Sequence, residues 1–421
     1  MWILGIANRW FLLRGLPVLR AIPGVRDLPL VHGHCWIRRV NFPDADRRRL
    51  KQAVNRSTVA FLGPNHPEFA SDWFVDKELS TYVAPRMASW ADRGIVAAAP
   101  KFWGMNNLIA NDGGDAARAY SVECALDGHG VLLHPEGTVR WTNDVVHPLF
   151  PGIAQMAMRA AVLTREAVFI VPVVWKYQFV GDVSARLHRE MAIIENALHL
   201  DPGTSLSIAQ RFSALQRNIL LSQMRRYGLT EASVTDHFFE RQKDFQQHLV
   251  RKLEQRYHIA STDQLDKRIA RIARAIQSER SLLRKDTTPG VASRREILRR
   301  DHEMADEAKR LGEFTRDVYG AETLTQEQMS ESLKRIRDRM LRRNWKDVLA
   351  KTIPRPLGPR ILHIGVPEPI AVVDVAQLEL AEYETVLLEL TRRRMQDALD
   401  RINDSIATDV GTYRVENLLL G

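Results

Sequence analysis

The chain has 421 residues, 45% of them hydrophobic and 26% charged, a composition that buries an apolar core and excludes a largely disordered protein. It has no uncharged apolar run of about 18 residues, so no ordinary membrane-spanning helix is expected. Its 60 Lys and Arg residues exceed its 51 Asp and Glu residues by nine. This favours anionic partners such as nucleic acid, lipid headgroups or an acidic carrier, although a soluble basic enzyme has the same balance.

The N-terminal segment, residues 1–33, begins with apolar residues and is interrupted by Arg9, Arg14 and Arg20. A signal peptide has its basic residues first, and this segment is too short and too charged to span a bilayer. Tryptophans beside arginines are typical of an amphipathic segment that lies in the headgroup layer. A helix packed on the protein core is the other interpretation, and the sequence leaves both open.

No metal site is predicted. Cys35 and Cys124 form no CxxC pair, and His129, His147 and His188 lack the spacing of metal ligands. Two cysteines in a chain of this length fit a reducing compartment.

Short apolar strands alternate with helical segments before residue 181. Strands are predicted at residues 34–40, 57–62, 130–134 and 168–175, and helices at 44–55, 72–80 and 151–164. A loop is predicted at residues 63–66. This alternation is typical of an α/β fold, and we expect a mixed, largely parallel sheet flanked by helices.

The composition changes near Gly181. Residues 182–350 are rich in Arg, Gln, Glu, Leu and Ala, and residues 266–300 alone hold eleven Lys and Arg against four Asp and Glu, a surplus of seven. Apolar side chains recur there at helical spacing, at Leu265, Ile269, Ile272 and Ile276. We therefore predict a basic α-helical insertion. Its charged face is either exposed to solvent, or binds an anionic membrane surface, or binds an acidic carrier protein.

A strand pattern returns at residues 360–366, and a last helix is predicted at 375–405. The expected domains are an N-terminal amphipathic segment at 1–33, the first part of an α/β domain at 34–181, the helical insertion at 182–350, and the return strand and C-terminal helix of the α/β domain at 351–421.

Three segments carry the candidate chemistry. The first holds His66 and Asp72, the second is His-Pro-Glu-Gly-Thr at residues 134–138, and the third is Val-Pro-Val at 171–173. A histidine is the usual general base near neutral pH, and a carboxylate fixes its tautomer. Exposed N–H groups in a turn after a strand favour a phosphate. We predict direct attack by an activated substrate hydroxyl, with no Ser or Cys of the chain as the nucleophile.

The order and spacing of these motifs, over residues 55–180, resemble the glycerophospholipid acyltransferase family, typified by the lysophosphatidic acid acyltransferases. The resemblance implies that His66 and Asp72 form a catalytic dyad. The later stretch 365–370 also resembles the family's Gly-x-Pro-Ile strand. Residues 182–350 are then an insertion between two strands of one catalytic domain.

The dyad departs from the family pattern, because five residues separate His66 from Asp72 where the family usually has four. On a regular helix six positions correspond to about 600°, which places the two side chains well apart. We therefore expect His66 on a loop before the helix, with the extra residue in a turn. Glu68 and Asp76 are fallback carboxylates, and without a dyad His66 is a turn residue that caps the helix.

The resemblance assigns acceptor binding to the second motif and its surroundings, with the candidate residues Glu136, Gly137, Thr138, Arg140 and Asn111. The family has an arginine in a motif that corresponds to residues 107–114, but this stretch has none, and residues 111–114 are predicted to be a plain loop. Arg140 and Arg118 are the candidate substitutes. His134 stands where the family usually has phenylalanine.

The resemblance implies an enzyme that moves a fatty acyl group from a thioester donor to the hydroxyl of a lysophospholipid or a glycerol-phosphate-like acceptor. The donor is acyl-CoA or acyl carrier protein, and no other cofactor and no metal is expected. Expected partners are the lipid acceptor, an anionic membrane surface and acyl carrier protein. No nucleic acid is expected, because no recognised nucleic-acid module appears.

The expected location is cytoplasmic, peripheral at the inner face of the plasma membrane. Two other interpretations stay open: a non-catalytic lipid-binding member of the same fold, and a helical scaffold that binds anionic surfaces. An acyl-transfer assay separates the first alternative from the enzyme, and binding at varied salt separates the second.

Overall fold

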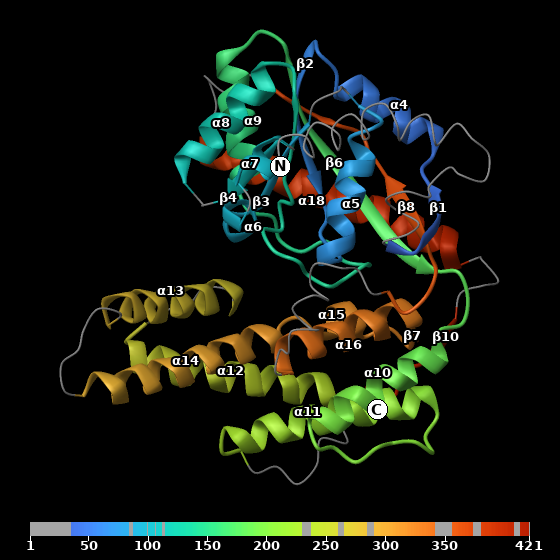
Figure 1. Ribbon diagram of the computed structural model, residues 1–421, viewed down its shortest axis with the longest axis vertical. Coiled ribbons are helices and arrows are strands. Elements are labelled where there is room, and N and C mark those ends of the chain that lie inside the picture. The colour runs from blue at the N-terminus through green and yellow to red at the C-terminus, as the bar shows by residue number, and fades with distance from the viewer. Residues whose placement is uncertain are drawn as a thin grey trace. The chain divides into compact units, whose positions relative to one another are not determined.

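The structure is a computed structural model that describes residues 35–83, 87–98, 100–105, 107–111, 114–229, 237–259, 265–283, 290–341, 356–373, 380–407 and 413–420. The chain forms two compact units (Figure 1). The first is an α/β unit made of Met1–Val183 and Arg342–Tyr413, and the second is a helical unit made of Ser184–Leu341 and Arg414–Gly421. The predicted N-terminal segment 1–33 lies outside the described residues.

The α/β unit contains an eight-stranded sheet in which seven strands follow the order β1-β8-β6-β2-β5-β3-β4, while β9 also pairs with β6. The strands are β1 Ile37–Asn41, β2 Thr58–Pro64, β3 Met87–Asp92, β4 Leu108–Asn111, β5 Gly130–Leu132, β6 Ala167–Phe179, β8 Arg360–Gly365 and β9 Ile370–Val372. All neighbouring strands are parallel except the pairs that β6 makes with β8 and β9. The predicted mixed, largely parallel sheet is therefore confirmed.

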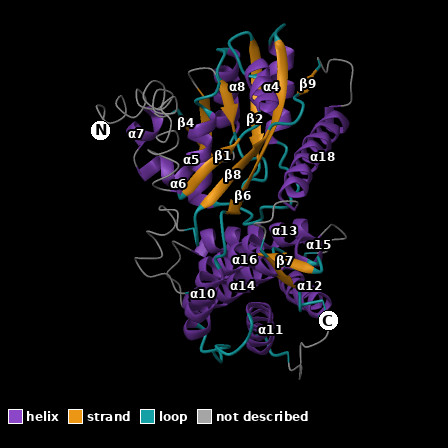
Figure 2. Cartoon of the chain, turned by 90° about the vertical axis from the view of Figure 1, so that its right-hand side faces the viewer, coloured by secondary structure: helices purple, strands orange, loops and turns teal. Residues whose placement is uncertain are grey.

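Helices cover both faces of this sheet, as Figure 2 shows for α18 and α5 on opposite sides of the strands. The helices of the unit are α4 Asp44–Ala53, α5 Phe69–Leu79, α6 Arg93–Ala98, α7 Pro100–Met105, α8 Asp115–Leu126, α9 Gly152–Leu163 and α18 Leu380–Ala407. Along β2, Val59 and Phe61 pack with α8 and α9, whereas Ala60 and Leu62 pack with α4 and α5. A strand that is apolar on both faces is typical of a parallel sheet buried between helices.

The predicted strands and helices of this unit occur close to their expected positions, but some bounds differ and some elements were not predicted. Gly63 and Pro64, predicted to begin a loop, are the last residues of β2. Strands β3 and β4 and helices α6, α7 and α8 were not predicted, and Asn111, the first residue of the expected loop 111–114, is the last residue of β4. Helix α5 begins at Phe69, three residues before its expected start, and Asp72 therefore lies in its first turn.

The helical unit is inserted between two strands that pair with each other. Residues Phe179 of β6 and Arg360 of β8 are register partners in the sheet, although the whole helical segment separates them in sequence. The helices are α10 Ser184–Ala197, α11 Ile208–Arg226, α12 Phe238–Tyr257, α13 Leu265–Leu283, α14 Val291–Leu311, α15 Arg316–Tyr319 and α16 Gln326–Met340.

The apolar stripe predicted on α13 is buried at Ile269, Ile272 and Ile276. A two-stranded sheet joins β7, Thr323–Thr325, to β10, Arg414–Glu416. The end of the chain, Arg414–Gly421, therefore belongs to the helical unit, and the assignment of all of 351–421 to the α/β domain needs this correction.

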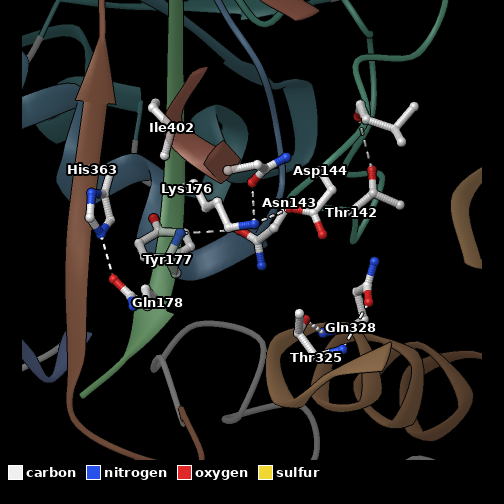
Figure 3. A network of polar contacts seen from close by, with 12 residues as sticks. Thr142, Asn143, Asp144, Lys176, Tyr177, Gln178, Thr325, Gln328, His363 and Ile402 are labelled. Carbon is white, nitrogen blue, oxygen red and sulfur yellow. Dashed lines mark hydrogen bonds and ion pairs between the residues drawn. The ribbon is translucent and has the colours of Figure 1, made fainter. Parts of the chain in front are cut away.

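The loop that follows the second motif is fastened to the sheet through a buried lysine (Figure 3). Lys176 of β6 forms an ion pair with Asp144 and also donates a hydrogen bond to Asn403 Oδ1 at 2.5 Å. The backbone N–H of Tyr177 donates to Asn143 Oδ1 at 3.2 Å. These contacts hold the loop after residue 138 against β6 and α18, so the segment that carries the acceptor-binding candidates has a fixed position.

Candidate active site

Two histidines lie at the carboxyl ends of neighbouring parallel strands. His66 follows β2 and His134 follows β5, and these strands are paired through Phe61 with Val131 and through Leu62 with Leu132. In open α/β sheets this edge is where ligands usually bind. The first and second sequence motifs therefore meet at the edge where the fold predicts a site.

Asn65 fixes the loop that carries His66. Its side-chain oxygen accepts the backbone N–H of Trp175 at 2.9 Å, and its amide nitrogen donates to the Trp175 carbonyl at 3.0 Å. Its own backbone N–H donates to the Val173 carbonyl at 3.2 Å. The asparagine side chain thus continues the pairing of β2 with β6 by one position, and His66 leaves the sheet from an anchored residue.

His66 and Asp72 form the pair that the sequence predicted. Nδ1 of His66 lies 2.8 Å from Oδ2 of Asp72. His66 lies on the loop, Glu68 is the residue before helix α5, and Asp72 lies in the first helical turn. The extra residue is thus taken up before the helix, and the six-position separation leaves both side chains in contact.

Asp72 accepts hydrogen bonds on both carboxylate oxygens. Oδ2 also receives the backbone N–H of Glu68 at 2.8 Å. Oδ1 receives the indole N–H of Trp175 at 3.0 Å and the phenol O–H of Tyr177 at 2.8 Å. A carboxylate held from two strand residues and one helix-start residue cannot rotate freely, so the orientation of the His66 ring is set by the fold.

A buried ion pair lies next to the residues that hold Asp72. Nη1 of Arg360 lies 2.6 Å from Oε2 of Glu68, and Nη2 donates to Ser71 Oγ at 2.9 Å. The guanidinium also lies over the ring of Tyr177, 4.2 Å from its centroid. The carboxylate of Glu68 is therefore paired with Arg360, and it is not the carboxylate partner of His66.

His134 pairs with the second fallback carboxylate. Its Nε2 lies 3.3 Å from Oδ2 of Asp76, and its Nδ1 lies 2.9 Å from the backbone oxygen of Asn65. Its ring lies flat on that of His66, with centroids 3.9 Å apart and planes at 16°. The site thus contains two stacked His–Asp pairs, of which the sequence predicted only one. The signal was present in the spacing of Asp72 and Asp76, which lie on one face of α5 as residues i and i+4.

Burial and charge shift the titration of the first pair. Burial, together with the positive charge of His134, holds the pKa of His66 well below its usual value, so this imidazole is neutral at pH 7. Burial raises the pKa of Asp72 to about 7, against the charge of His134 and the hydrogen bonds from Glu68 and Tyr177. Because an ionised Asp72 only accepts, Nδ1 of His66 carries the proton and Nε2 carries the lone pair.

Nε2 of His66 has no hydrogen-bond partner among the residues that the structure describes. The side chain is 17% exposed, whereas that of Asp72 is fully buried. A neutral imidazole with a fixed tautomer and one accessible lone pair is the form that removes a proton from a hydroxyl.

Glu136 of the second motif contacts the backbone of two loops. The carboxylate is buried, and burial raises its pKa to about 7. It accepts the backbone N–H of His147 at 3.1 Å and also interacts with the backbone N–H of His66. A second negative charge gives an anionic acceptor no favourable contact, so we interpret Glu136 as a support that ties the two loops together.

Gly137, Thr138 and Arg140 lie on the turn after β5, where Nη2 of Arg140 donates to the Glu136 carbonyl at 3.4 Å. Gly137 is exposed and has a positive φ of 70°, and a Cβ there would lie 2.6 Å from the ring of Phe150. Only glycine keeps this turn open. The backbone N–H of Arg140 donates to the His66 carbonyl at 3.0 Å, so this arginine lies beside the base. Its Nε is buried without a hydrogen-bond partner in the described part of the chain.

Asn111 and Arg118 are not brought to His66. Asn111 is the exposed last residue of β4, which lies two strands beyond β5 in the sheet. Arg118 lies on α8, where it forms an ion pair of 2.5 Å with Asp115. Of the two candidate arginines, the structure therefore favours Arg140.

The described ranges hold no group of three or more His, Cys, Asp or Glu side chains placed to bind a metal ion. Cys35 and Cys124 are both buried and unpaired. Among the helices within those ranges, none is both long and apolar enough to cross a bilayer.

Comparisons of the chain with family models, with curated proteins and with solved structures found no match. The likeness to the acyltransferase family therefore depends on the motifs and on the geometry of the residues that carry them.

Proposed function

We propose that this protein is an acyltransferase that moves a fatty acyl group from a thioester donor to the hydroxyl of an anionic, lysophospholipid-like or glycerol-phosphate-like acceptor. One observation carries the proposal: Nδ1 of His66 lies 2.8 Å from Asp72, which leaves Nε2 free to act as a general base at the carboxyl edge of the sheet. The resemblance of the motifs supplies the reaction class.

The reaction proceeds by direct transfer. Nε2 of His66 takes the proton of the acceptor hydroxyl as its oxygen bonds to the thioester carbonyl carbon. Asp72 stabilises the imidazolium that forms. The carbon–sulfur bond then breaks, and the thiolate that leaves takes the proton from His66. Products are the acyl ester and the free thiol, and the base returns to its neutral form.

The acceptor is proposed to bind beside His66, with its phosphate on Arg140 and on the turn at Gly137 and Thr138. Arg140 is joined through its backbone to the His66 carbonyl, so the backbones that carry the anion site and the base keep a fixed separation. A fixed distance selects the hydroxyl that reaches Nε2 when the phosphate is bound.

The experiment that tests the function is an acyl-transfer assay on the full chain. The donors are palmitoyl-CoA and palmitoyl acyl carrier protein, and the acceptors are lysophosphatidic acid, glycerol 3-phosphate and uncharged monoacylglycerol. We expect thiol release and an ester product with an anionic acceptor. If no acceptor yields a product with either donor, the protein is not an acyltransferase, and lipid binding without turnover then favours the non-catalytic alternative.

Replacement of Arg140 by glutamine is expected to raise KM for the anionic acceptor about tenfold or more, because one charge-assisted hydrogen bond is lost. The value of kcat should change little, because His66 and Asp72 stay in place. Steady-state kinetics with varied acceptor measure both constants. The matched control is Arg118→Gln, which removes an arginine from an ion pair on α8. Equal effects of the two variants would contradict the placement of the phosphate at Arg140.

Turnover is expected to fall as the pH drops through about 7. Asp72 has its pKa raised to about 7 by burial, so it is ionised above that pH and protonated below it. Once protonated, Asp72 no longer stabilises a positive charge on His66, and the rate declines with decreasing pH. A profile of kcat against pH from 5 to 8.5 measures this limb. A rate that stays constant down to pH 5 would exclude Asp72 as the controlling group.

Attachment to the cytoplasmic face of the plasma membrane stays part of the proposal. Its basis is the arrangement of tryptophans and arginines in residues 1–33 of the sequence. The acyl acceptor and the acyl product are lipids, so a peripheral position at a membrane suits both.

A further inference from the structure

Both ring nitrogens of His134 face atoms that accept hydrogen bonds. Nδ1 lies 2.9 Å from the backbone oxygen of Asn65, and Nε2 lies 3.3 Å from Oδ2 of Asp76. A carbonyl oxygen and a carboxylate oxygen only accept, so each nitrogen must carry a proton to satisfy its neighbour. With Asp76 ionised, this geometry is that of a doubly protonated, positively charged imidazolium.

The positive charge of His134 stabilises the buried carboxylate of Asp76. Asp76 is 4% exposed, and its Oδ1 is buried without a hydrogen-bond partner among the described residues. A buried carboxylate with one oxygen unsatisfied is costly unless a positive charge lies beside it. His134 supplies that charge, and the pair is neutral as a whole.

The imidazolium lies flat against the ring of the proposed base. The centroids of His66 and His134 are 3.9 Å apart. Two positive charges at that separation repel strongly, so a proton on His134 disfavours a second proton on His66. The ionisable neighbours that act on these two rings are Asp72 and Asp76 from α5 and Glu136 from the loop after β5. Around them, Glu68 and Tyr177 act on Asp72, Arg140 acts on Glu136, and Arg360 acts on Glu68 and Tyr177.

We propose that His134 is a positioning residue for the base: held as an imidazolium between Asp76 and the Asn65 carbonyl, it keeps His66 neutral and ready to accept a proton. The role of His134 in catalysis rests on the proposed function, whereas the charged state of His134 beside a neutral His66 does not. The family that the motifs resemble usually has phenylalanine at this position, and a phenylalanine side chain carries no charge. His134 thus gives this chain a means of setting the protonation of His66.

The titration of the two rings agrees with this role. Burial disfavours the charged form of His134, but the carboxylate of Asp76 outweighs it and raises the pKa of His134 to about 9. Burial and the charge of His134 act in the same direction on His66 and lower its pKa. At pH 7 one ring of the stack is charged and the other is neutral.

The test is an NMR titration of the histidine ring signals in the full chain, which needs no turnover. Signals are assigned with His66→Gln and His134→Gln. We expect His134 to stay doubly protonated up to about pH 9, and the midpoint of His66 to rise by roughly 1–3 units in His134→Phe and in His134→Gln. The phenylalanine keeps an aromatic ring at the position, and the glutamine keeps an uncharged hydrogen-bond donor. If one variant does not fold, the other still tests the proposal.

The matched control is His302→Gln, which removes another His–Asp contact, with Asp306 on α14, and should leave His66 unchanged. A His134 midpoint near the ordinary 6.5, or a His66 midpoint that stays the same in both variants, overturns the proposal. If the shifts occur but no acyl transfer is found, the charge arrangement stands and only the proposed function fails. If transfer occurs without the shifts, the reverse holds.

Discussion

Replacement of His66 by alanine is expected to lower the rate of acyl transfer by about 10²–10⁴-fold, because the acceptor hydroxyl then loses its general base. Transfer of an acyl group from a thioester to an un-ionised hydroxyl is slow. His134, the nearest ring, uses both of its nitrogens for Asn65 and Asp76. The measurement is kcat/KM with palmitoyl-CoA and lysophosphatidic acid.

The fold should survive this change. His66 lies on a loop, and its side chain belongs to neither of the two apolar clusters that flank the sheet. The thermal unfolding midpoint and the far-ultraviolet circular dichroism should therefore match the wild type within a few degrees. His302→Ala, on the surface of α14, is the control for removal of an imidazole. A His66→Ala variant that retains near-wild-type turnover removes the general-base assignment.

Replacement of Asp72 by asparagine is expected to lower kcat by about 10³–10⁴-fold while the shape of the side chain is kept. The asparagine amide can donate to Nδ1 of His66, which allows the ring to place its proton on Nε2, the wrong nitrogen. Because His66 and Asp72 act as one unit, the double variant His66→Ala, Asp72→Asn should be no slower than His66→Ala alone. Single-turnover kinetics with enzyme in excess measure the chemical step.

Asp115→Asn is the matched control, since Asp115 also lies in the first turn of a helix but is fully exposed on α8. It should leave kcat within a factor of two of the wild type, on the order expected for a surface change. Losses in the double variant that equal the product of the two single losses would show that the residues act independently, and the dyad would have to be abandoned.

The sheet and its main helices could be predicted because their sequence patterns are local. The apolar run at β2 and the charged helix α4, with Asp44 and Asp46 in its first turn, carry the signals of strand and helix within a few residues. The position of His66 on a loop was also a local inference, because six helical positions could not bring it to Asp72. These features follow from neighbouring residues alone.

Strands β3 and β4 could not be predicted in this way. Residues 87–92, Met-Ala-Ser-Trp-Ala-Asp, have no β-branched residue, and β4 ends in the Asn that starts a loop-like sequence. Both segments form strands because β3 pairs with the edge of β5, and β4 then pairs with β3. Pairing across the sheet overrides a weak local preference.

The support of the site depends on contacts far apart in sequence. Arg360 reaches Glu68 across 292 residues, and Trp175 reaches Asp72 across 103. Neither partner can be found without the order of the strands. The role of His134 was missed for the same reason, since its stacking on His66 exists only because β2 and β5 are neighbours.

The place of β8 has a consequence for the order in which a growing chain can complete itself. Strand β1 pairs only with β8 among the described strands, and Ile37 is the register partner of Arg360, 323 positions later. A ribosome that adds roughly 5–20 residues per second needs about 16–65 s to cover that interval. During this time β1 has no neighbour, and Glu68 has no guanidinium. The nascent protein therefore lacks both contacts until β8 has been synthesised, when the arrival of a single strand supplies the partner of β1 and the partner of Glu68.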